Sequence, residues 1–204
     1  KAKFPVILSG AGVVLGGAIN ECKKLAEKLD APVCNGYQHN DSFPGSHPLA
    51  VGPLGYNGSK AAMELISKAD VVLALGTRLN PFSTLPGYGV DYWPKNATII
   101  QVDMNPDRIG LTKKVTVGIC GDSKQVAQQI IDKLSVDAGD TGREERKNLI
   151  HKTKSAWLQT LSGLDHEEDD PGTVWNKEAR ERDKDRMSPR QAWRAIQDAL
   201  PEDV

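Results

Sequence analysis

The chain has 204 residues, of which 26 are basic and 27 are acidic, so its net charge at pH 7 is −1. This length accommodates one large α/β domain, or a smaller domain followed by a tail. The balanced charge excludes a polyanion-binding protein of the strongly basic kind and gives no reason to expect a membrane surface as partner. No apolar stretch approaches the roughly 20 residues that a membrane-spanning helix needs.

Five short apolar runs are predicted to be strands of one parallel sheet. Each is too short for a typical helix and too continuously apolar for a half-exposed strand, which is typical of strands covered on both faces. In chain order they are Pro5–Ser9, Ala31–Cys34, Val71–Leu75, Thr98–Val102 and Val115–Ile119.

Amphipathic segments alternate with these strands and are predicted to be helices, because their apolar residues recur every three or four positions. One follows the turn Gly10–Gly12, one follows Ser59 as its cap, and one starts at Ser123. Residues 36–58 and 80–96 are rich in proline and glycine and are predicted to be loops. The alternation predicts an α/β fold with a Rossmann-like doubly wound parallel sheet.

The composition changes after Ser135. Residues 143–164 are predicted to form one helix with an apolar stripe that includes Ile150 and Trp157. In residues 165–186, 14 of the 22 side chains are charged, which predicts an extended or mobile connector. Ser188-Pro-Arg-Gln then has the pattern of a capping box with proline at the first helical position. We therefore expect a main domain at 1–135, a helix and charged linker at 136–187, and the first helix of a truncated domain at 188–204.

Three cysteines, Cys22, Cys34 and Cys120, are scattered through the predicted helices and strands. Their spacing matches no metal-binding motif, so we interpret them as reduced core residues of a cytoplasmic protein. His39 and His47 lack the i, i+4 partner of a helical metal site, and no metal site is predicted.

The tripeptide Gly76-Thr77-Arg78 directly follows the strand Val71–Leu75. Ligands of open α/β sheets bind beyond the carboxyl ends of the strands. A hydroxyl and a guanidinium at this position favour an anion-binding edge. The alternative is that Gly76 only ends the strand and Arg78 pairs with a surface carboxylate. The residues alone leave both interpretations open.

The turn Gly10-Ala11-Gly12 is similar to a dinucleotide fingerprint but departs from it in two respects. Gly16 falls one residue late, and Cys34-Asn35 stand where an acid would end the second strand. A turn that aims a helix N-terminus at a phosphate or carboxylate fits these residues. A tight turn without any ligand fits them equally well.

Aspartates follow the last two predicted strands. Asp103 can accept hydrogen bonds from ribose hydroxyls, or it can cap the segment that starts at Pro106. Asn105 and Asp107 resemble a calcium loop only superficially, since further ligands are missing. Asp122 follows the last predicted strand.

Five segments between residues 3 and 135 carry a family resemblance. They read Pro5-Val-Ile-Leu-Ser-Gly-Ala-Gly, Phe43-Pro-Gly-Ser-His-Pro, Gly52-Pro-Leu-Gly-Tyr-Asn-Gly, Ala69-Asp-Val-Val-Leu-Ala-Leu-Gly-Thr-Arg-Leu and Ile100-Gln-Val-Asp-Met-Asn-Pro. Together they resemble the central domain of thiamine-diphosphate enzymes, the family of acetolactate synthase, pyruvate oxidase and oxalyl-CoA decarboxylase. Residues 36–41 and 80–89 look most like the sulfoacetaldehyde acetyltransferase branch of that family.

The resemblance implies a subunit of three domains, in which N- and C-terminal domains missing from this chain hold thiamine diphosphate and Mg²⁺. It implies a cytoplasmic homodimer or homotetramer that converts sulfoacetaldehyde and phosphate to acetyl phosphate and sulfite, in taurine degradation. The activating glutamate and the Gly-Asp-Gly…Asn motif belong to those other domains. We therefore expect no catalytic residue in this segment, and no activity of the segment alone.

In relatives that bind FAD or ADP, the central domain holds the nucleotide along the strand ends. Leu79-Asn80-Pro81 replaces the acidic run of flavin-binding relatives, so a vestigial pocket is expected and bound FAD or ADP is the alternative. The cofactor-binding positions that match are Gly10, Ala11, Gly12, Gly76, Thr77, Arg78, Asp103 and Asp122.

Other interpretations remain open on the sequence. The chain is also similar to the central domain of other thiamine-diphosphate enzymes of the acetolactate synthase kind. A stand-alone nucleotide-binding module, with the similar NAD fold of sirtuins and deoxyhypusine synthase, is a second alternative, although zinc-type cysteine pairs are absent. A purely structural domain that braces subunits is the third.

Overall fold

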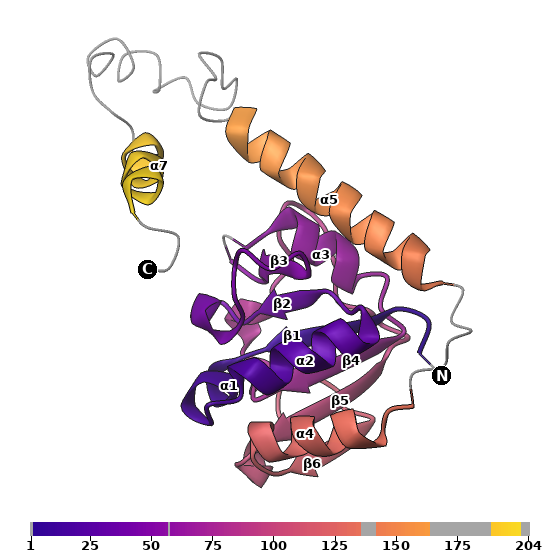
Figure 1. The fold of residues 1–204 in the computed structure, drawn as a ribbon. Coiled ribbons are helices and arrows are strands. Elements are labelled where there is room, and N and C mark those ends of the chain that lie inside the picture. The colour runs from indigo at the N-terminus through magenta and orange to yellow at the C-terminus, as the bar shows by residue number, and fades with distance from the viewer. Residues whose placement is uncertain (1, 57, 136–141, 164–188, 201–204) are drawn as a thin grey trace. The chain divides into compact units, whose positions relative to one another are not determined.

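A computed structural model describes residues 2–56, 58–135, 142–163 and 189–200 (Figure 1). The chain divides into two compact units, Lys1–Trp157 and Leu158–Val204. The predicted connector at 165–186 and the capping residue Ser188 lie outside the described residues.

Six parallel strands form one sheet in the first unit. Their order across the sheet is β3-β2-β1-β4-β5-β6. Successive strands are added on one side of β1 as far as β3 and on its other side from β4 onward, so the switch point of the sheet lies between β1 and β4. This is the strand order of a doubly wound α/β fold, and the predicted fold class is confirmed. The strands are β1 (Pro5–Ser9), β2 (Val33–Asn35), β3 (Ala50–Pro53), β4 (Val71–Leu75), β5 (Thr98–Asp103) and β6 (Val117–Cys120).

The two central strands explain the continuous apolar runs in the sequence. All five residues of β1 are buried, as are the last four of β4. Ile7 of β1 pairs with Val33 on one side and with Leu73 on the other. Since both faces of these strands are covered, no alternation of polar and apolar residues is needed.

The edge strand β3 was not predicted, because residues 36–58 were interpreted as loop. β3 has four residues, among them Gly52 with φ +91° and Pro53, and it pairs in parallel with β2. A glycine and a proline in so short a run conceal a strand from pattern analysis.

The helices of the structure are α1 (Ala11–Leu15), α2 (Ile19–Leu29), α3 (Lys60–Ile66), α4 (Ser123–Lys133), α5 (Arg143–Gly163) and α7 (Pro189–Ala199). α2 and α4 cover the face of the sheet turned to the viewer in Figure 1. The right-handedness of parallel crossovers places α3, which connects β3 to β4, on the opposite face.

The ends of these helices follow local chemistry. The predicted cap of α3 is confirmed, since Ser59 Oγ accepts a hydrogen bond of 3.2 Å from the amide of Ala62. The first predicted helix is instead divided into α1 and α2 after Gly16, where Gly17 adopts the left-handed φ of +60°. The predicted start of α4 at Ser123 is confirmed, and Asp122 is its N-cap.

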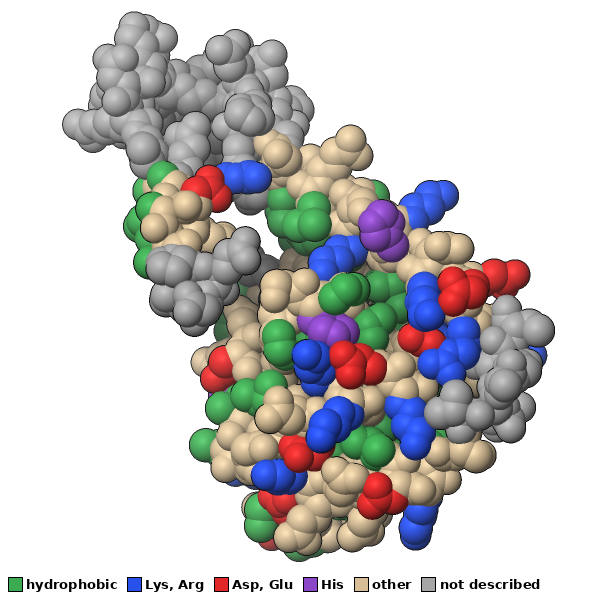
Figure 2. Space-filling view, viewed as in Figure 1, with side chains coloured by type: hydrophobic (Ala, Val, Ile, Leu, Met, Phe, Trp, Pro, Cys, Tyr) green, Lys and Arg blue, Asp and Glu red, His purple; other side chains and the backbone are tan. Residues whose placement is uncertain are grey.

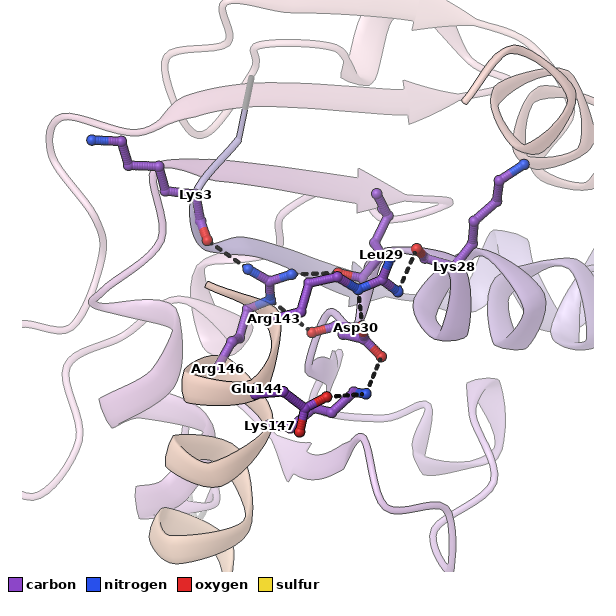
Figure 3. A network of polar contacts seen from close by, with 8 residues as sticks. All are labelled: Lys3, Lys28, Leu29, Asp30, Arg143, Glu144, Arg146 and Lys147. Atoms are coloured by element: carbon purple, nitrogen blue, oxygen red, sulfur yellow. Dashed lines mark hydrogen bonds and ion pairs between the residues drawn. The ribbon is translucent and has the colours of Figure 1, made fainter. Parts of the chain in front are cut away.

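Arg146 of α5 fastens this helix to the C-terminal end of α2 (Figure 3). Its guanidinium donates to the carbonyl oxygens of Asp30 (3.0 Å) and Leu29 (2.9 Å). A third bond of 2.7 Å reaches the carbonyl oxygen of Lys3, just before β1. The last carbonyls of a helix have no partner within the helix and carry partial negative charge, so a buried arginine satisfies them well.

Arg143 adds to the same attachment. Its Nε donates to the carboxylate of Asp30, and its Nη2 donates to the carbonyl oxygen of Lys28 at 3.2 Å. Lys147 Nζ lies 3.7 Å from the other carboxylate oxygen of Asp30. Asp30 is therefore held by two cations while its own backbone adopts φ +46°.

α5 also contributes to the core of the first unit. Ile150, predicted to lie in an apolar stripe, is 2% exposed within the core cluster. Lys154 Nζ donates to the carbonyl oxygen of His47 at 3.0 Å, and burial lowers the pKa of this lysine. Trp157 meets Tyr88 edge to face at 5.6 Å between ring centroids. The compact unit Lys1–Trp157 therefore extends beyond residue 135, where the change in composition led us to expect the end of the main domain.

In the second unit, α7 is amphipathic. Trp193, Ile196 and Leu200 are exposed and recur at a spacing of three to four residues, as on one face of a helix.

Two of the three cysteines are buried as predicted, and the prediction was wrong for Cys120. Cys22 and Cys34 lie in the core, whereas Cys120 ends the edge strand β6 and is exposed. The surface carries mixed charges: Figure 2 shows basic and acidic side chains interspersed over the visible face of the first unit. None of the helices in the described ranges is both long and apolar enough to cross a membrane.

Candidate functional site

The turns after β1 and β4 cross in direct backbone contact. The amide of Gly10 donates to the carbonyl oxygen of Leu75 at 3.1 Å, and the amide of Gly12 donates to that of Gly76 at 2.8 Å. A Cβ at Gly12 would lie 2.7 Å from Gly76 Cα, and one at Gly10 would lie 2.6 Å from Thr77 Cβ. The backbone contact alone requires these glycines, so their presence does not by itself indicate a ligand.

A cavity of about 400 Å³ opens beside this crossing, at the carboxyl ends of the central strands. Such a volume is within the range of small-molecule sites, and its position is the switch point at which doubly wound sheets bind ligands. All eight predicted cofactor-binding residues line it: Gly10, Ala11, Gly12, Gly76, Thr77, Arg78, Asp103 and Asp122. The structure brings these residues together, and their binding of a cofactor stays a prediction.

Arg78 and Thr77 have distinct places in the cavity wall. Thr77 is buried, and its Oγ1 accepts a hydrogen bond of 3.2 Å from the amide of Leu79. Leu79 is fully buried with the left-handed φ of +53°. Arg78 between them is exposed and lines the cavity. Within the described ranges no carboxylate forms an ion pair with Arg78, so the alternative of a surface ion pair finds no partner there.

The two aspartates each hold their own loop. Asp103 Oδ1 accepts a hydrogen bond of 2.9 Å from the amide of Asn105. Asp122 Oδ1 accepts from the amides of Lys124 (3.1 Å) and Gln125 (3.0 Å) at the start of α4. One carboxylate oxygen of each residue is thus engaged within the protein, and both residues line the cavity.

Sequence reasoning missed several residues of the cavity wall. Arg108 lies in the segment after Pro106 that the sequence predicts only as a capped turn, yet it lines the cavity. A basic residue five positions after a strand is too common a pattern to single out. The other residues missed lie in the first predicted helix, in the segments interpreted as loops, or beside the predicted positions: Leu15, Gly16, Gly36, Tyr37, Gln38, His39, Asn80, Ser83, Met104 and Ser123.

The donor set of the cavity suits an anionic ligand with hydroxyl groups. Two arginines supply charged donors, and two aspartates supply acceptors for hydroxyls. In the described part of the chain, no three His, Cys, Asp or Glu side chains come close enough to hold a metal ion.

Comparison with known proteins identifies relatives of this chain. The family profile described as "Thiamine pyrophosphate enzyme, central domain" matches residues 1–130. The probable sulfoacetaldehyde acetyltransferase of Rhizobium meliloti (strain 1021) is 78% identical over 204 residues. The sulfoacetaldehyde acetyltransferase of Roseovarius nubinhibens is 73% identical over 204 residues. A probable acetolactate synthase large subunit of Methanocaldococcus jannaschii is 38% identical over 164 residues, which are 80% of this chain and 25% of that protein.

The chain spans about a third of the length of its similar curated relatives: the first two matches cover 100% of this chain and 34% of each relative. The profile match covers more than half of the chain and coincides with the sheet, the glycine crossing and the cavity. The chain belongs to the thiamine pyrophosphate enzyme family, and residues 1–130 match its central domain.

Proposed function

We propose that the chain is the central domain of a sulfoacetaldehyde acetyltransferase, which converts sulfoacetaldehyde and phosphate to acetyl phosphate and sulfite. The observation that carries this proposal is the extent of the similarity. Relatives of that name match this chain at 78%, 73% and 67% identity over 98–100% of its length. The acetolactate synthase relative of Methanocaldococcus jannaschii reaches 38% over 80% of the chain.

In this proposal the chain has a structural role within a larger enzyme. Thiamine diphosphate, bound with Mg²⁺ by other domains, supplies the carbanion-stabilising chemistry of the complete protein. In this proposal the segment alone binds that cofactor weakly and releases no sulfite, because the motifs that the family resemblance assigns to cofactor binding belong to the other domains. We further propose that the complete protein is a homodimer or homotetramer. We also propose that it is cytoplasmic, in keeping with the buried, unpaired Cys22 and Cys34.

A chimera tests the enzymatic proposal. The region of the Rhizobium meliloti relative that aligns with this chain would be replaced by the 204 residues, and phosphate-dependent sulfite release would be measured with thiamine diphosphate and Mg²⁺. The chimera should retain activity within about tenfold of the parent. The isolated 204 residues serve as control and should release no sulfite. A folded chimera without activity, or sulfite release by the isolated chain, would contradict the proposal.

The cavity supports a second, independent proposal, namely that its eight predicted residues bind a nucleoside diphosphate. The observation in its favour is that two arginines and two aspartates line the same cavity at the switch point of the sheet. Titration calorimetry of ADP into the 204-residue chain tests it. Binding in the micromolar range would support the proposal. No binding at millimolar ADP would contradict it and would indicate that the pocket is vestigial.

A further inference from the structure

One buried amide connects the two arginine loops of the cavity. Gln101 lies in β5, two residues before Asp103, and its side chain is fully buried. Gln101 Nε2 donates to the carbonyl oxygens of Thr77 (3.1 Å) and Arg108 (3.2 Å). Its Oε1 accepts a hydrogen bond of 2.9 Å from the amide of Gly110. Both ends of the amide are therefore satisfied, and all three partners are backbone atoms of loops at the carboxyl edge of the sheet.

These bonds fix the backbone from which the two arginine side chains extend. Both carbonyl oxygens accept from the same nitrogen, so the main chains at Thr77 and Arg108 run next to each other. Thr77 immediately precedes Arg78. On the other side of Arg78, Thr112 Oγ1 donates to the carbonyl oxygen of Leu79 at 2.7 Å. The backbone on both sides of Arg78 is thus tied to the loop that carries Arg108.

We propose that Gln101 is a positioning residue that holds Arg78 and Arg108 at a fixed spacing, as a two-arginine site for the diphosphate of a nucleoside diphosphate. This inference rests on the proposed nucleotide function of the cavity and adds two residues, Gln101 and Arg108, to the predicted set. A guanidinium can bind a phosphate through two parallel hydrogen bonds. Because the backbone of both loops is fixed in advance, only the two arginine side chains have to become ordered when the ligand binds.

A fixed pair also discriminates between ligands. A diphosphate offers one phosphate to each arginine, whereas a monophosphate engages one of them at a time. The ratio of ADP affinity to AMP affinity therefore reports the spacing of the pair. A residue that only stabilised the fold would lower the unfolding midpoint and leave this ratio unchanged.

The test is calorimetric titration of ADP and AMP into the 204-residue chain and its variants, with urea unfolding of each. In Gln101→Leu the amide is replaced by an apolar side chain of similar size, and ADP affinity should fall about tenfold, or about 1.4 kcal/mol, with a much smaller loss for AMP. Arg108→Ala changes only an exposed side chain, so its folding is secure, and it should reduce the ADP-to-AMP ratio similarly. The double variant should lose little more than either single one, because both remove the same pairing.

Ser59→Ala is the matched control, since it removes a buried hydrogen bond at the cap of α3, outside the cavity wall. It should lower stability without changing the ratio. A wild-type ratio in Gln101→Leu or in Arg108→Ala would overturn the positioning role while the nucleotide proposal stood. Absence of ADP binding in the wild-type chain would overturn both proposals, so the two failures are distinguishable.

Discussion

The amide of Gly12 and the carbonyl oxygen of Gly76 are joined by a hydrogen bond of 2.8 Å. This bond locks the first βα turn onto the turn that follows β4, at the point where the strand order reverses. Gly76 has φ +60°, and a Cβ there would lie 2.7 Å from backbone atoms of Gly12. Two backbones thus meet with no room for a side chain on either.

Gly12→Ala should therefore destabilise the fold. The added methyl group would lie 2.7 Å from Gly76 Cα, and overpacking against backbone costs about 1–3 kcal/mol. Urea unfolding monitored by circular dichroism measures the loss. Gly45→Ala is the control, because a Cβ there meets nothing within 4 Å, and its midpoint should match the wild type. Equal midpoints for both variants would show that the crossing relaxes freely.

If the cavity binds ADP, Arg78→Ala should weaken that binding about ten- to hundredfold, since a hydrogen bond to a charged group contributes roughly 1.5–3 kcal/mol. Arg78→Lys should recover only part of the loss, because an ammonium lacks the planar fork that binds two phosphate oxygens. Calorimetry with ADP gives the three affinities. Lys68→Ala, which removes an exposed cation just before β4, should leave the affinity unchanged. Equal affinity in wild type and both Arg78 variants would exclude Arg78 as a ligand.

Arg146→Met should destabilise the first unit by about 1–3 kcal/mol, because the carbonyl oxygens of Lys3, Leu29 and Asp30 lose their donor where burial limits replacement by water. Arg146→Lys should recover part of this, since a lysine cannot reach all three acceptors at once. Lys152→Met on the same helix changes an exposed cation and should be nearly neutral. Denaturant unfolding compares the three, and a neutral Arg146→Met would show that α5 is held by its apolar contacts alone.

Stability should decline at alkaline pH. Burial raises the pKa of Cys22 from about 9 to about 12, raises that of Cys34 as well, and raises the pKa of Tyr92 to about 12. These groups are neutral when protonated, and the folded state retains their protons to higher pH than the unfolded state. Their contribution is complete below about pH 9 and is lost as the pH rises toward 12. Unfolding midpoints between pH 8 and 11 should fall, with a shallower slope above pH 10 for Tyr92→Phe. Midpoints independent of pH would contradict this.

The sequence predicts most of the central sheet and eight of the residues that line the cavity. β1 and β4 are continuous apolar runs with exact boundaries, because burial on both faces leaves one pattern for them. The predicted glycines and aspartates meet because the carboxyl ends of parallel strands share one edge. Gln101 could not be found this way, since its partners are three carbonyl or amide groups that no side-chain pattern reveals. The attachment of α5 escaped for the same reason, as Arg146 looks like any surface cation until its backbone partners are known.

The attachment of α5 and the cavity lie at opposite ends of the same strands. Arg146 reaches Lys3 and the end of α2, at the amino edge of the sheet, whereas the arginine pair stands at the carboxyl edge. A strand of five residues separates them by roughly 16 Å. Energetic effects of substitutions at such separations add with little interaction. Substitutions at the carboxyl edge can therefore alter or abolish ligand binding while α5 stays attached through Arg146 at the amino edge.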